Sequence, residues 1–296
     1  MPHAHHASVA SLWVSVALSL VAIVYLRQWL RVAWLDPDGV KGWRAWSFFV
    51  GLLLVWVALG SPLSLLDHDL LTVHMVQHLL LLTLAPPLIL LGAPLKLLPR
   101  RSVQKQKLVE LIAGPLLSTP MRQLGRLLLH PAISWIGATA ALVVWHVPAV
   151  FALGLRSQTW HGVEQASFLV TGLLFWRPVA EPSPDTLKWP EPSILLYLFL
   201  ATLPCDILAG FLVFCDRVVY PAYFFSSQTF GLSALEDQQC AGALMWTCVT
   251  LVYLIAGTIV TARSLSFDGS QGYAIRQSET QAVALRKSDM QKVEMI

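Results

Sequence analysis

The length, composition and charge of the chain exclude an ordinary soluble domain. It has 296 residues, of which 56% are hydrophobic and 12% are charged, and its formal net charge is +3. A soluble globular domain carries roughly 25% charged residues, so a water-covered exterior would need far more charge than this chain has. The composition therefore predicts a membrane protein, and the small net charge gives no reason to expect a nucleic-acid partner.

Seven apolar segments follow one another along the chain, each long enough to cross a bilayer as a helix. A helix of about 20 apolar residues spans the hydrocarbon core because it satisfies its own backbone donors and acceptors. The predicted spans cover residues 12–29, 46–61, 71–91, 132–153, 161–176, 193–214 and 240–261. We therefore predict an all-α, polytopic helix bundle over residues 12–262, with no second folded domain.

The basic residues predict how these spans are oriented. If the N-terminus lies outside, all 20 Lys and Arg residues except Arg156 and Arg217 fall on the cytoplasmic side. An excess of Lys and Arg marks cytoplasmic loops, so we predict an outside N-terminus and a cytoplasmic C-terminus, in a bacterial plasma membrane. This topology places a short His-containing tail (1–11) outside. It places a basic, partly helical loop (about 96–130) and a polar, disordered tail (263–296) inside.

A few ionisable and soft side chains within the spans are the strongest functional candidates. A charge at the bilayer centre costs about 2.5–3.5 kcal/mol, so polar residues retained there are functional suspects. His74 and His78 are four residues apart in the third span, which puts them on one helix face. The full set, all in the outer half of the predicted topology, is His74, His78, His146, His161, Asp237 and Met245.

Imidazole, thioether and carboxylate groups at one depth suit a transition metal. Neutral imidazole binds copper and zinc well, and the soft methionine sulfur selects Cu(I). We therefore predict a metal site formed by these six residues, with Cu(I) as the expected ion. Two alternatives stay open. Any one histidine could be a hydrogen-bonded packing residue, which for His74 alone is an equally good explanation, and a haem b group could take His74 or His78 with His146 or His161 as axial ligands.

Other polar residues have less specific interpretations. His68 lies in a short outer loop, where it is either solvated or able to receive an ion. His130 precedes a proline and is predicted to mark a helix start rather than to bind metal. Cys215 and Cys240 lie near the outer surface and either pair or bind copper. Asp206 either caps a broken helical turn or contacts a partner.

A set of short motifs follows in order along the membrane domain. They are Ser61-Pro62-Leu63, His74-Met75-Val76-Gln77-His78, Ala85-Pro86-Pro87, His130-Pro131, Trp145-His146-Val147-Pro148, His161 with Glu164, Tyr220-Pro221 with Tyr223, and Asp237-Gln238 with Ala241-Gly242 and Met245-Trp246. Over about residues 60–262 this ordered set resembles the CtaG family, assembly factors for caa3-type cytochrome c oxidase. One position departs from the family pattern: the fifth helix there usually reads His-x-x-Glu-His, and here Gln165 follows Glu164.

The resemblance implies a factor that helps to deliver or insert copper into a respiratory oxidase without itself catalysing a reaction. The implied partners are cytochrome c oxidase subunits in the same membrane and a soluble copper carrier, with no nucleic acid among them. If the missing second histidine were an essential ligand, Gln165 would make this protein bind metal differently or more weakly.

Overall fold

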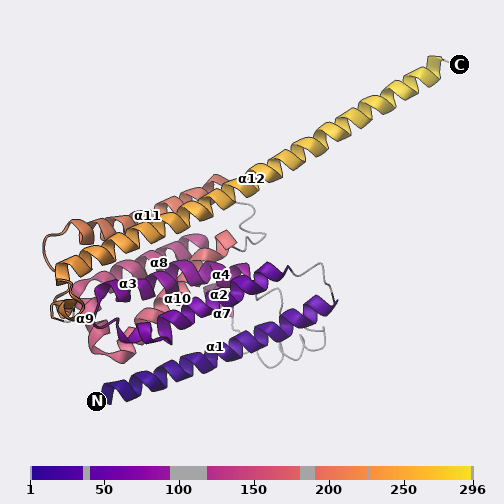
Figure 1. Ribbon diagram of the computed structural model, residues 1–296. Coiled ribbons are helices and arrows are strands. Elements are labelled where there is room, and N and C mark those ends of the chain that lie inside the picture. Colours follow the sequence, from indigo (N-terminus) through magenta and orange to yellow (C-terminus); the bar gives the residue numbers. More distant parts are fainter. Residues whose placement is uncertain (1, 36–40, 94–118, 181–190, 226, 295–296) are drawn as a thin grey trace.

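The structure is a computed structural model that describes residues 2–35, 41–93, 119–180, 191–225 and 227–294 (Figure 1). Within these ranges the chain is helical and has no strand, as the composition predicts. The helices are α1 (Pro2–Leu35), α2 (Gly42–Leu59), α3 (Leu71–Leu79), α4 (Ala85–Leu91), α7 (Thr119–Leu128), α8 (Pro131–His146), α9 (Pro148–Arg156), α10 (Gln158–Ala180), α11 (Glu191–Phe214) and α12 (Ala234–Glu294), with short turns η1 (Pro62–Leu65), η2 (Leu80–Leu84), η3 (Pro221–Tyr223) and η4 (Ser227–Phe230).

The span formed by α3, η2 and α4 is the centre of the bundle. In its most apolar stretch 56% of the residues are buried, against 6% in the span of α1, which packs mainly on α2. Helices α2, α10 and α12 all pack against the central span, and α11 and α8 lie beyond them. Polar side chains on this span are therefore shielded by protein on several sides.

The central span contains a π-helical turn, η2, because two prolines follow it. Pro86 has no N–H to donate to the carbonyl of Leu82, four residues earlier. The indole Nε1 of Trp176 donates to that carbonyl instead, at 3.1 Å. A Cβ atom at Gly172 would lie 2.8 Å from the same carbonyl oxygen, so only glycine lets α10 approach this closely. The Leu82 carbonyl, which has no N–H partner at Pro86, thus holds α10 against the central span.

The fourth predicted span, residues 132–153, is not one helix, which corrects the sequence-based expectation. Helices α8 and α9 meet at an angle of 79°, with Val147 between them. Pro148 explains the break, because its ring clashes with the preceding turn and it cannot donate a backbone hydrogen bond. The hydroxyl of Tyr220 donates to the carbonyl of His146 at 2.9 Å, which satisfies one of the acceptors at the end of α8.

By length and composition, five helical segments in the described part of the chain qualify as membrane spans, or six if the bent α8–α9 pair is one span. Seven were predicted. The five are Ser11–Leu35, Gly42–Ser64, Leu71–Leu91, Ser193–Phe214 and Ala234–Arg263. Helix α10 contains the fifth predicted span and is 23 residues long, but it does not qualify. It carries His161, Glu164 and Arg177, which reduce its mean hydropathy.

The two ends of the chain are more helical than the sequence predicts. Helix α1 begins at Pro2 and takes in most of the expected tail 1–11. Helix α12 continues through Glu294 and projects away from the bundle, where a disordered segment was expected (Figure 1). Ala, Gln, Arg, Lys and Met are frequent there, and all favour helix. In the predicted basic loop, α7 is described and residues 94–118 lie outside the described residues.

Candidate metal centre

Five buried polar side chains gather around the start of α3. Two come from α3 itself, His74 and His78, one helical turn apart. Two come from α10, His161 and Glu164, which are three residues apart and so share a face. Asp67 completes the set from the turn between η1 and α3. All five side chains are buried, and Glu164 is not exposed at all.

The distances within this cluster are those expected between ligands of one metal ion. Glu164 Oε1 lies 3.5 Å from His74 Nε2 and 3.4 Å from His78 Nε2. Asp67 Oδ2 lies 3.5 Å from His161 Nε2. An N–H···O hydrogen bond usually spans about 2.7–3.2 Å. Two ligands on a tetrahedral ion with bonds of about 2.0–2.1 Å are separated by about 3.4 Å.

The cluster divides into two groups of three that share His74. One is Asp67, His74 and His161, and the other is His74, His78 and Glu164. In each group the three ligand atoms lie within 4.8 Å of one another. Both ring nitrogens of His74 and His78, and both carboxylate oxygens of Asp67 and Glu164, are buried without a hydrogen-bond partner. Buried polar groups are normally satisfied, so the residues present fit a bound cation.

The bend between α8 and α9 makes room for the central carboxylate. A Cβ atom at Gly154, in α9, would lie 2.9 Å from Glu164 Oε2. That is closer than a carbon and an oxygen approach without a hydrogen bond, so a side chain at 154 would displace the carboxylate. The glycine therefore sets the position of Glu164 beneath α9.

At the outer edge of the cluster, Asp67 connects the buried groups to the surface. Its backbone carbonyl accepts a hydrogen bond from the Tyr223 hydroxyl at 2.8 Å. Burial raises the pKa of the Asp67 carboxyl, and the nearby His68 and His74 oppose this shift only in part. His68 Nε2 lies 3.7 Å from Asp67 Oδ1, and the His68 side chain is 52% exposed. His68 is thus the solvent-facing neighbour of the cluster.

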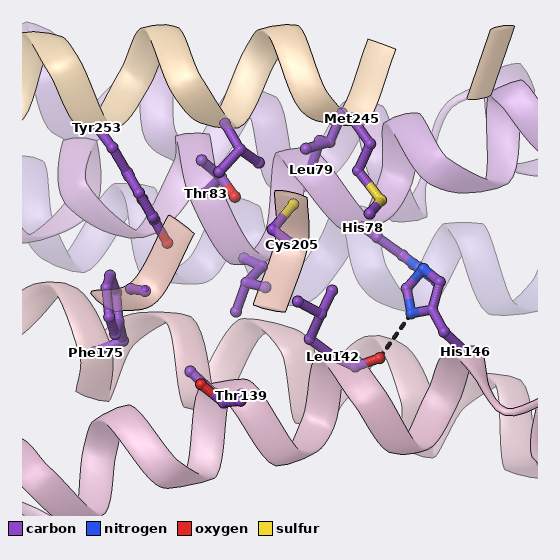
Figure 2. Close-up of a pocket in the computed structure, with 14 residues that line it drawn as sticks. His78, Leu79, Thr83, Thr139, Leu142, His146, Phe175, Cys205, Met245 and Tyr253 are labelled. Atoms are coloured by element: carbon purple, nitrogen blue, oxygen red, sulfur yellow. Dashed lines mark hydrogen bonds between the residues drawn. The ribbon is translucent and has the colours of Figure 1, made fainter. Parts of the chain in front are cut away.

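His146 lies beside the cluster but faces a different partner. Its Nδ1 donates to the Leu142 carbonyl at 2.7 Å, and its Nε2 lies 3.3 Å from Met75 Sδ. Met245 lines a cavity of about 40 Å³ together with His78 and His146. Figure 2 shows Met245 and His146 extending into this cavity from α12 and α8. Two of the predicted ligands, His146 and Met245, are therefore near each other but outside the carboxylate groups.

Asp237, a third predicted ligand, has another role. Its Oδ2 accepts from the Leu71 N–H at 2.7 Å, and its Oδ1 accepts from the Thr72 N–H at 3.1 Å and the Thr72 hydroxyl at 2.7 Å. The first N–H groups of a helix lack partners within it, and a carboxylate satisfies them well. Asp237 therefore caps α3.

The haem alternative is not supported by this geometry. A haem needs a flat cavity between its two axial ligands, and cofactor pockets usually measure about 300–1,000 Å³. The cavity beside His78 and His146 measures about 40 Å³. His78 and His146, one of the axial pairs considered for a haem, line this cavity together, and the space between them does not hold a macrocycle.

Comparison with known proteins identifies the family. The family model described as cytochrome c oxidase caa3 assembly factor (CtaG) matches residues 23–266. The chain belongs to the CtaG family. Uncharacterized protein Mb0105 of Mycobacterium bovis and uncharacterized protein MT0111 of Mycobacterium tuberculosis are each 24% identical to it over 238 residues. These matches cover 74% of this chain and 35% of each relative, so the chain spans about a third of their length. No solved structure matches.

The residue that departs from the CtaG pattern lies next to the cluster. Gln165 Nε2 is 3.1 Å from His161 Nε2 and donates to Gln77 Oε1 at 3.5 Å. Gln77 in turn donates to the Ala58 carbonyl at 3.1 Å. Where the CtaG pattern offers a second imidazole, this chain has an amide that fixes the orientation of His161.

The residues predicted from the sequence do not include two members of the cluster, Glu164 and Asp67. Glu164 follows His161 by three residues in an apolar segment, which was a usable signal; its carboxylate lies within reach of two imidazoles of α3. Asp67 stands just before α3, and no sequence pattern marks it as a ligand. Its position in the cluster depends on contacts between distant segments.

The other sequence candidates lie away from the cluster. His130 is exposed and immediately precedes α8, which confirms that it marks a helix start. Cys215 and Cys240 are free cysteines and form no disulfide. The Oδ1 atom of Asp206 is buried without a hydrogen-bond partner, beside a groove between α11 and α12.

Proposed function

We propose that this protein is a copper-binding, non-enzymatic factor that assists metal loading of a cytochrome c oxidase. The observation that carries the proposal is the set of buried, unsatisfied carboxylate and imidazole groups around His74. A structural role alone would leave several charged or polar groups in the protein interior without partners, at a cost of about 1–3 kcal/mol each. A cation bound between them removes that cost.

Copper is the proposed ion for two reasons. Imidazole binds copper well, and the thioether sulfurs of Met75 and Met245 beside the cluster favour Cu(I). Membership of the family of caa3 cytochrome c oxidase assembly factors supplies the second reason, because the oxidase itself contains copper. The shared position of His74 between two ligand groups also suits an ion that is passed on rather than kept.

The proposed topology keeps seven spans, with the metal centre towards the outer face. Helix α10 runs within the bundle and packs on α8, α4 and α9, and at 23 residues it is about 34 Å long, enough to cross the hydrocarbon core. Figure 1 places the N-terminus and α9 at one end of the bundle. Basic residues lie at the ends of three helices that are far from the cluster: Arg44 in α2, Arg177 in α10 and Arg263 in the α12 span. The positive-inside rule assigns such an end to the cytoplasmic face.

The proposed partners follow from this placement. Cytochrome c oxidase subunits in the same bacterial plasma membrane would receive the copper, and a soluble carrier on the outer side would supply it. His68, half exposed beside Asp67, is the nearest group that such a carrier could reach. Exchange of an ion between proteins requires donors of this kind at the surface of the site.

The test compares copper loading in three proteins at matched expression. Wild type, the double variant His74→Ala/His78→Ala and the single variant His130→Ala are purified without oxygen, and copper per protein is measured after incubation with Cu(I). Wild type and His130→Ala are expected to load equally, because His130 is exposed and lies before α8, away from the cluster.

The double variant is expected to lose most of its copper and to leave the cell's haem–copper oxidase inactive at unchanged abundance of the assembly factor. A double variant that loads copper and supports the oxidase as wild type does would refute the proposal. Accessibility labelling of a cysteine introduced at position 68 tests the orientation, with labelling only from the cytoplasm as the contradicting result.

A further inference from the structure

A second group of potential ligands lies beside the carboxylate cluster and is chemically softer. It comprises His146 at the end of α8, Met75 on α3 and Met245 on α12. His146, Met75 and Met245 are all buried. Met75 and Met245 belong to one apolar core cluster, which also contains Leu142. The surroundings of this group are therefore hydrocarbon and thioether, with no carboxylate among the residues that line the adjoining cavity.

The hydrogen bonds of His146 determine which of its nitrogens is free. A carbonyl oxygen only accepts, so the 2.7 Å contact with the Leu142 carbonyl requires a proton on Nδ1 (dashed in Figure 2). In a neutral imidazole, Nε2 then carries a lone pair. The contact between that Nε2 and Met75 Sδ, at 3.3 Å, brings two electron-pair donors together with no proton between them.

This arrangement is the one that metal-binding histidines adopt. A ligating imidazole usually donates its other N–H to a backbone carbonyl or carboxylate, which fixes the ring and its tautomer. One nitrogen and one sulfur on a tetrahedral ion, with bonds of about 2.0 and 2.3 Å, are about 3.5 Å apart. The observed 3.3 Å is close to that separation.

A small cavity beside His146 gives an ion its space. It measures about 40 Å³ and is lined by His78, His146 and Met245, with Cys205 on its wall. Figure 2 shows the Met245 side chain pointing into this cavity opposite His146. The volume is enough for a bare ion and too small for an organic ligand.

We propose that His146, Met75 and Met245 form a second metal site that takes Cu(I) or another soft monovalent cation. The inference deepens the proposed function and rests on it, because it gives the same protein two copper sites of different hardness. His78 borders both, since it contacts Glu164 on one side and lines the cavity with His146 on the other. Copper moves between them by ligand exchange, with no change of oxidation state.

The test uses two probes on the full-length protein in detergent: Ag(I), which prefers sulfur, and Zn(II), which prefers imidazole and carboxylate. The variants are Met75→Leu for the soft site and Glu164→Gln for the carboxylate cluster. Met290→Leu is the matched control, since it changes a methionine beyond the bundle. Leucine conserves the volume of methionine, so packing is retained. X-ray absorption spectroscopy of bound Cu(I) provides a second readout, because it detects whether a thioether sulfur coordinates the ion.

We expect Met75→Leu to weaken Ag(I) binding by more than about tenfold, to remove the thioether signal and to leave Zn(II) binding unchanged. Glu164→Gln should weaken Zn(II) binding and leave Ag(I) binding and the thioether signal unchanged. Met290→Leu should bind both ions as wild type does. Equal Ag(I) binding by wild type and Met75→Leu, or an absent thioether signal in wild type, would overturn the second site alone. If wild type binds Ag(I) but not Zn(II), the carboxylate cluster is refuted as a metal site, and the second site is still supported.

Discussion

Two buried carboxylates at the same end of the bundle, Asp237 and Glu164, have opposite surroundings. Asp237 accepts three hydrogen bonds, two from backbone N–H groups at the start of α3 and one from the Thr72 hydroxyl. Glu164 is equally buried, and neither of its oxygens has a hydrogen-bond partner. Its polar neighbours are imidazole nitrogens at 3.4 and 3.5 Å.

The difference separates a carboxylate that holds the fold from one that is available to a ligand. Asp237 joins α12 to α3, and removing it leaves donors in the protein interior unpaired. Glu164 contributes little to the fold as it stands, because a buried carboxylate without hydrogen bonds is destabilising. Burial and residue type alone, which are the same for both, do not distinguish the two roles; the hydrogen bonds do.

The largest expected effect on stability comes from Asp237→Ala. It leaves the N–H groups of Leu71 and Thr72 unpaired, at a cost of about 1–3 kcal/mol for each buried group. We expect a lower melting temperature and lower abundance in the membrane. Asp216→Ala, which changes an exposed carboxylate between α11 and α12, is the control and should melt like wild type. Equal melting of the two variants would show that the cap does not matter.

The converse is expected for Glu164→Gln. Because Glu164 makes no hydrogen bond that the change would remove, the melting temperature of the metal-free protein should stay the same or rise. Copper affinity should fall by more than about tenfold, since loss of groups that merely support a ligand already costs 10- to 100-fold. Thermal melting and competition with a Cu(I) chelator measure both quantities. A lower melting temperature with unchanged affinity would place Glu164 with Asp237 as a structural residue.

Gly154→Ala sharpens the comparison without removing any ligand. The added methyl group would lie 2.9 Å from Glu164 Oε2 and should displace the carboxylate by a few tenths of an ångström. We expect copper affinity to fall about three- to tenfold, or about 1 kcal/mol, with little change in melting temperature. Gly162→Ala is a matched control on α10, because no atom lies within 4 Å of the added carbon. Equal copper affinity in the two variants would contradict the proposed position of Glu164.

The smallest effect is expected from deletion of residues 275–296. Residues 275–294 of α12 project away from the bundle and are not part of the cluster (Figure 1). Insertion, copper loading and oxidase activity should all remain near wild type. Loss of oxidase activity at unchanged abundance and copper content would show that the segment docks a partner.

The sequence predicted the all-helical fold, and three of the predicted ligands, His74, His78 and His161, lie together in the buried cluster. Long apolar runs predict membrane helices because the bilayer requires them, and the spacing of His74 and His78 predicts a shared face. The bend at Val147 was missed, since a proline in an apolar run does not reveal whether the helix continues at another angle. The hydrogen bonds of Asp237 to the start of α3 were not predicted, because the sequence does not show which helix start lies beside this carboxylate. Met75 required the position of α8, which sequence spacing does not supply.

In the proposed function, the burial of the cluster has a consequence for how an ion would reach it. His74, His78 and Glu164 are 1%, 4% and 0% exposed, so a hydrated cation does not fit among them. The water molecules of the ion would be replaced one at a time by ligand atoms of the protein. His68 would be the first of these ligands, because its side chain is 52% exposed, whereas the described residues of the cluster are buried. Entry is therefore governed by the rate of successive substitutions at the rim rather than by diffusion. Capture from dilute solution should be slow, and transfer from a protein that already holds the ion without water should be fast.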